Sequence, residues 1–176
     1  MYGLVAGALH PLLTPAHLIV LVALGLLLGQ QGVRHWTLDF PSFAVTLVAG
    51  LLLSNVYGNP FPFDNNLILL AVALLAGLLA VVAYPLPRWL VWLLVVKAST
   101  VIGLDTVPTV LPGIAAHKIY LTLAGSALSS CALLLGLSVF SFYLSKLWEG
   151  IAVRVLGSWV TASAVLTLAL RFAHKT

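Results

Sequence analysis

The sequence predicts an all-α integral membrane protein, a six-transmembrane-helix bundle with a short N-terminal helical or re-entrant segment. Of its 176 residues, 62% are hydrophobic and only 7% are charged, whereas soluble domains average about 45–50% and about 25%. The mean hydropathy is +1.15, and the apolar stretches are continuous rather than alternating as in barrel strands. A spanning helix needs roughly 20 residues, so the chain has room for six in a single domain, residues 1–176.

This composition also excludes several classes of protein. Eight basic and four acidic side chains cannot cover the surface of a water-soluble protein of this size. We therefore expect the lipid bilayer as the surrounding medium and no nucleic-acid partner. No HExxH, CxxC, GxSxG or phosphate-loop pattern occurs, so we expect no enzymatic activity and no required cofactor.

Proline, glycine and asparagine mark the ends of the expected helices. Thr14 is the expected N-cap of the first span, with Pro15 at its first helical position. The apolar segment before it contains Pro11 and carries no Lys or Arg, so we expect a retained segment rather than a signal peptide. The expected spans are residues 14–29, 40–57, 66–84, 89–104, 117–144 and 150–172.

Basic residues in the short loops predict the orientation. Arg34, Arg88, Lys146 and Arg154 fall in or beside the first, third and fifth loops, whereas the second and fourth loops contain only Lys118. Because cytoplasmic loops are enriched in Lys and Arg, both termini are expected on the non-cytoplasmic side. We expect the bacterial inner membrane, or an equivalent internal membrane, as the location.

Small residues four apart predict where helices pack closely. Such steps let backbones approach each other in lipid, within one chain or between subunits. We therefore expect either a homo-oligomer or association with other membrane subunits. The packing glycines are Gly25, Gly29, Gly50, Gly125 and Gly157.

Lys97 and Asp105 are ionisable residues of the fourth span. Such residues are costly in a membrane and usually face the bundle interior or a cavity. Eight residues separate them, which places them close to one helix face. One interpretation is a cation–carboxylate pair lining a polar path; the other is a structural lysine bonded to carbonyls or to another carboxylate.

Histidines supply the candidate metal ligands. His10 and His17 are two helical turns apart, and a break at the prolines between them still allows the rings to converge. His117 begins the fifth span. Imidazole binds nickel, copper, zinc and iron, so these residues do not define one ion; a structural, hydrogen-bonded role is the alternative.

The stretch GALHPLLTPAHLIVLVALGLLLGQQG resembles the first-helix signature of the HupE/UreJ family. His10, Pro11 and His17 carry the match, and Arg154 and Gly157 resemble the family's Arg-x-x-Gly pattern near the C-terminus. The resemblance implies a six-helix permease associated with hydrogenase or urease operons and with nickel or cobalt uptake.

Three parts of the chain depart from the family pattern. Ala16 occupies the position of an aspartate, and KASTVIGLD replaces a histidine-rich stretch, keeping only Gly103 and Asp105. An acidic position before the third span corresponds to Asn66, with Asp64 two residues away. Removing imidazoles and carboxylates from a metal path changes which substrate binds, so these departures argue against nickel or cobalt specificity.

Two functions follow from these observations. The first is a diverged permease that passes a small solute or ion along His10, His17, Lys97 and Asp105, with helix-breaking prolines at the site. The second is a non-transporting structural or accessory subunit of a larger membrane complex that retains the same fold. A polar cavity favours the first function, and a core filled by side chains favours the second.

Overall fold

The computed structural model describes residues 2–33, 36–57, 64–106 and 116–173. Within these ranges the protein forms seven helices and no strand. The first helix is the expected N-terminal segment, and the other six coincide with the expected spans to within a few residues. The helices are α1 (Tyr2–Leu13), α2 (Pro15–Gln31), α3 (Trp36–Tyr57), α4 (Asn65–Val82), α5 (Arg88–Asp105), α6 (Ala116–Leu147) and α7 (Ile151–Ala173).

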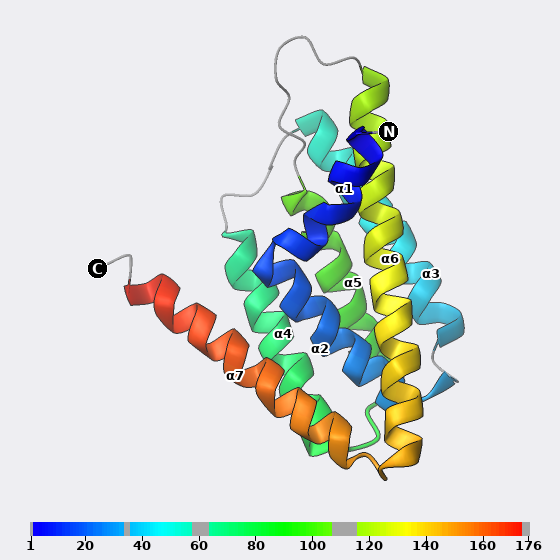
Figure 1. The fold of residues 1–176 in the computed structure, drawn as a ribbon, viewed down its shortest axis with the longest axis vertical. Coiled ribbons are helices and arrows are strands. Elements are labelled where there is room, and N and C mark those ends of the chain that lie inside the picture. Colours follow the sequence, from blue (N-terminus) through cyan, green and yellow to red (C-terminus); the bar gives the residue numbers. More distant parts are fainter. Residues whose placement is uncertain (1, 34–35, 58–63, 107–115, 174–176) are drawn as a thin grey trace.

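Helices α2 to α7 run alternately in opposite directions, with α1 crossing the upper part of α6 (Figure 1). We call the end where α2 and α4 begin, and where α5 and α7 finish, the histidine end. There Arg171 Nη1 contacts Asp64 Oδ1 at 2.6 Å, joining α7 to α4. At the opposite end Gln31 Nε2 donates to the Tyr84 carbonyl at 3.0 Å, tying α2 to the chain that follows α4.

Helix α2 lies at the centre of the bundle and packs against α4, α5, α6 and α7. Its apolar residues from Val20 to Leu28 are almost all buried, and Leu24 and Leu27 have no exposed surface. Uniform burial explains why this helix is apolar on every side rather than amphipathic. The residues of α2 nearest the histidine end are therefore held by surrounding helices.

Glycines lie where helices approach most closely. A Cβ atom on Gly25 would come within 2.5 Å of Leu137 Cβ, and one on Gly103 within 2.6 Å of the Leu47 carbonyl oxygen. Gly50 lies against Gly103, and Gly157 lies beside Gly77. Gly29 contacts Ser138 and Ser141 of α6, and Gly125 contacts the Leu4 carbonyl of α1. These glycines therefore make contacts within one chain.

Helix α3 begins at Trp36, four residues before the expected start of the span. Pro41 lies inside this helix, in its second turn. The extra turn is held by Trp36, whose Nε1 donates to the Leu28 carbonyl at 3.2 Å and whose ring packs edge-on against Phe40 and Phe142. Arg34, used for the predicted orientation, lies outside the described residues.

Four described helices, α3, α4, α6 and α7, are each long and apolar enough to cross a membrane. Residues Gly7–Leu13 and Pro15–Gln31 form a bent pair that adds a fifth candidate if both belong to one span. Helix α5 has 18 residues and carries Arg88, Lys97 and Asp105, and it is not among these candidates. The described ranges therefore contain four to five candidate spans, and the count of six remains a prediction.

Candidate substrate site at the helix break

The break between α1 and α2 positions the first elements of the site. The two helices meet at 83°. Thr14 occupies the N-cap position and Pro15 the first turn, as expected, but the Thr14 side chain does not cap α2. Instead, its hydroxyl and its backbone N–H both donate to the His10 carbonyl, each at 3.1 Å. Thr14 therefore closes α1 and holds the His10 backbone close to the start of α2.

The break brings His10 and His17 together. Their ring centroids are 5.6 Å apart, and the rings are nearly perpendicular, at 71°. His17 is completely buried in the third position of α2, and His10 is partly buried. The convergence expected from a broken helix is present.

His17 also contacts the end of α5. Its Nε2 lies 3.0 Å from Asp105 Oδ2. Because an ionised carboxylate only accepts hydrogen bonds, Nε2 carries the proton and donates it to this bond. In the neutral ring, Nδ1 then keeps a free lone pair.

Two ring nitrogens of this cluster lack a hydrogen-bond partner. His17 Nδ1 and His10 Nε2 are both buried, and neither bonds to a described residue. Buried polar atoms in proteins are nearly always paired with protein, water or ligand. A metal-binding histidine typically donates its other N–H to a carboxylate, and His17 has this arrangement with Asp105.

Asn65 is a member of the cluster that the sequence did not identify. It is the first residue of α4 and is 6% exposed. Its side chain lies beside the Asp105 carboxylate, close to the bond that Asp105 accepts from His17. Its position beside Asp64, the N-cap of α4, is typical of a capping segment rather than a site.

The described residues contain no group of three or more His, Cys, Asp and Glu side chains arranged to hold a metal ion. The cluster offers two imidazole nitrogens, and Asp105 is engaged with His17. His117 lies at the start of α6, but its side chain is outside the described part of the chain. Two nitrogen ligands suit weak binding of a borderline cation that keeps most of its water.

Lys97 lies apart from this cluster. No hydrogen bond or ion pair joins Lys97 to Asp105, and the carboxylate of Asp105 contacts His17 instead. The packing of α2 against α5 brings His17 to the C-terminal end of α5, whereas Lys97 lies two turns before that end. Lys97 is exposed and lines a cavity of about 600 Å³ between α4 and α5.

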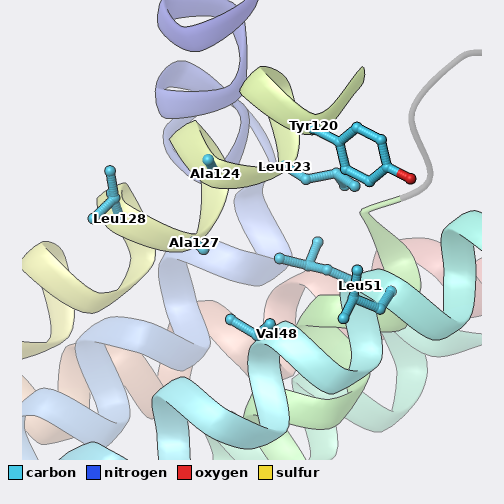
Figure 2. Close-up of a pocket in the computed structure, with 8 residues that line it drawn as sticks. Val48, Leu51, Tyr120, Leu123, Ala124, Ala127 and Leu128 are labelled. Atoms are coloured by element: carbon cyan, nitrogen blue, oxygen red, sulfur yellow. The ribbon is translucent and has the colours of Figure 1, made fainter. Parts of the chain in front are cut away.

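A second cavity, of about 410 Å³, lies between α3 and α6 (Figure 2). Figure 2 shows Val48 and Leu51 of α3 opposite Leu123 and Ala127 of α6. Its walls are apolar except for the Tyr120 hydroxyl. It therefore offers no set of polar groups for an ion.

A model of the HupE/UreJ proteins matches residues 1–167 of the chain. The chain belongs to the HupE/UreJ family. The match includes the helix break with both histidines, the end of α5 with Asp105, and all but the last residues of α7. This HupE/UreJ protein is an integral membrane protein of a family associated with nickel and cobalt transport. Searches of curated proteins and of solved structures give no match.

Proposed function

We propose that this HupE/UreJ protein is a membrane permease for a small solute or ion, and that the cluster at the helix break binds the substrate on its way through. The proposal rests on the adjacent imidazoles of His10 and His17. Each ring has one buried nitrogen without a hydrogen-bond partner among the described residues, and the His17 ring is held by Asp105. A broken helix at such a site is typical of transporters, because it exposes polar groups within the bundle. The family supports transport over the alternative of an accessory subunit.

A divalent transition-metal ion is the substrate class that this donor set fits best. Neutral imidazole nitrogens bind such ions, and Asp105 orients the His17 ring by accepting a hydrogen bond from its Nε2, which leaves the Nδ1 lone pair for the ion. Only two nitrogens are offered, so binding is weak, and weak binding allows the ion to leave the site again. Ala16, in place of a family aspartate, removes a carboxylate next to His17.

The basic residues support an orientation for this path. Arg88, Lys146 and Arg154 all lie at the end of the bundle opposite the histidine end. Cytoplasmic enrichment of basic residues predicts that the end with Arg88, Lys146 and Arg154 lies in the cytoplasm. His10 and His17 then face the external side. The cluster is then an entry site for uptake, with six spans that include α5.

Uptake into proteoliposomes tests the proposal. Purified protein is reconstituted around a metal-sensitive dye, and nickel, cobalt, zinc and manganese are added outside. We expect influx of at least one ion. Asp105→Asn should lower its apparent affinity by about 10- to 100-fold, as loss of an outer-shell partner does elsewhere. His17→Ala removes one of the two nitrogen ligands and should lower the affinity at least as much.

Asp64→Asn is the matched control. It also removes a carboxylate at the histidine end, but this carboxylate pairs with Arg171 rather than with a histidine. Influx should therefore persist in Asp64→Asn. Equal influx in the wild type, His17→Ala and Asp105→Asn contradicts the assignment of the site, and absence of influx for every ion contradicts the substrate class.

A further inference from the structure

The C-terminal end of α5 is in contact with α4 as well as with α2. Asp105 is the last residue of α5, and Asn65 is the first residue of α4. The two helices pack against each other, and Asn65 lines the same cavity as Leu104, the residue before Asp105. The Asn65 side chain lies beside the Asp105 carboxylate and is 6% exposed. A buried amide therefore lies next to the acid that holds His17.

The Asp105 carboxylate can accept a hydrogen bond from each of these neighbours. His17 Nε2 donates to Asp105 Oδ2 at 3.0 Å. An ionised carboxylate has a second oxygen and about four lone-pair positions in all, so it accepts from Asn65 without giving up His17. Besides the Asp105 carboxylate, no described residue is a partner for Asn65 Nδ2. Because buried N–H groups in proteins are nearly always paired, Asp105 is the acceptor for this amide.

Helix capping does not account for the Asn65 side chain. Asp64 occupies the N-cap position of α4. The Asp64 backbone carbonyl accepts the first helical hydrogen bonds, from the N–H groups of Leu67 and Ile68 at 2.9 and 3.3 Å. Capping by a side chain belongs to the N-cap residue rather than to the residue after it. The buried amide of Asn65 is therefore explained by Asp105 and not by the end of its own helix.

We propose that Asn65 is a positioning residue of the ion site, which fixes the Asp105 carboxylate so that it holds the His17 ring. This inference rests on the proposed function and deepens it. With one carboxylate oxygen bonded to Asn65 and the other to His17, the carboxyl group is held in one rotamer. Outer-shell groups of this kind orient a ligating imidazole. The Nδ1 lone pair of His17 is thereby kept in one orientation beside the His10 ring.

A double-mutant cycle of ion affinity tests the inference. The influx assay is repeated with Asn65→Ala, Asp105→Ala and the double variant, using whichever of nickel, cobalt, zinc and manganese enters fastest in the wild type. We expect Asn65→Ala to lower the apparent affinity by about tenfold, the lower end of the effects of outer-shell partners. In the Asp105→Ala background the same change should alter the affinity by less than about twofold, because the acceptor is absent. An equal loss in both backgrounds overturns the inference, because Asn65 then acts without Asp105.

A second measurement needs no ion and separates the inference from the proposed function. The protein is prepared with ¹⁵N-labelled histidine, and the His17 signals are assigned by their loss in His17→Ala. A charge-assisted hydrogen bond to a carboxylate moves the Nε2–H proton resonance downfield and slows its exchange with water. In Asn65→Ala this resonance should move upfield and exchange faster. An unchanged resonance overturns the inference. A shifted resonance in a protein that takes up no ion supports the positioning by Asn65 and contradicts the proposed function.

Asn66→Ala is the matched control. It removes the same side chain from the next position of α4, and Asn66 is not among the partners of Asp105 that the structure describes. The ion affinity and the His17 resonance should both stay as in the wild type. A loss in Asn66→Ala as large as that in Asn65→Ala overturns the inference, because the effect then comes from the start of α4 in general.

Discussion

The contact between α1, which carries His10, and α6 leads to a quantitative prediction about the stability of the protein. Pro11 has no N–H, so the carbonyl of Gly7, four residues earlier, cannot accept the usual helical hydrogen bond. Ser126 of α6 supplies the missing donor: its hydroxyl lies 2.9 Å from the Gly7 oxygen in a buried contact. We expect Ser126→Ala to destabilise the protein by about 1–3 kcal/mol, the cost of a buried, unsatisfied polar group.

A double-mutant cycle isolates this contact. In a Pro11→Ala background the new N–H donates to Gly7, so Ser126→Ala should cost less there by about 1 kcal/mol or more. The free energy of unfolding is measured by SDS titration of the protein in mixed micelles. Ser158→Ala is the control, because this exposed hydroxyl bonds only within α7. An equal cost of Ser126→Ala in both backgrounds refutes the reasoning.

Three further predictions concern packing, metal affinity and orientation. Gly103→Ala should destabilise the protein by about 1–3 kcal/mol in the same titration, because the new Cβ meets the α3 backbone. Gly136→Ala places its Cβ where nothing lies within 4 Å and should stabilise the protein by about 0.5–1 kcal/mol. A Gly103→Ala variant more stable than Gly136→Ala contradicts this. Nickel titration by calorimetry should show weak binding, and a tight one-to-one site abolished by His17→Ala disproves it. With the native cysteine replaced, Arg34→Cys and Arg88→Cys should be labelled from the cytoplasm; labelling of both from outside reverses the orientation.

The sequence allowed the helices to be located because their ends have local causes. Thr14 and Pro15 start α2 as expected, since the capping position and the proline act within one turn. The start of α3 was placed four residues too late. The added turn depends on contacts of Trp36 with α2 and α6. These are tertiary contacts, and local helix propensity does not reveal them.

The candidate site was only partly predictable for the same reason. His10, His17 and Asp105 were identified by residue type, and the seven-residue spacing of His10 and His17 indicated that their rings could converge. The contact between His17 and Asp105 was not predicted, because helical periodicity compares residues within one helix, whereas His17 lies 88 residues away on another. Asn65 carried no distinguishing signal, since asparagine beside a helix start is ordinary.

The separation of His10 and His17 shows that the helix break creates the site. In a continuous helix, seven residues place the two side chains on one face but about 10 Å apart along the axis, too far to share one ion. The 83° bend brings the ring centroids to 5.6 Å. The bend needs three contributions: Pro15 starts a new helix, Thr14 closes the old one at the His10 carbonyl, and Ser126 anchors α1 to α6. The two imidazoles are therefore held together by proline chemistry and by α6, so residues that never touch a substrate determine whether the site exists.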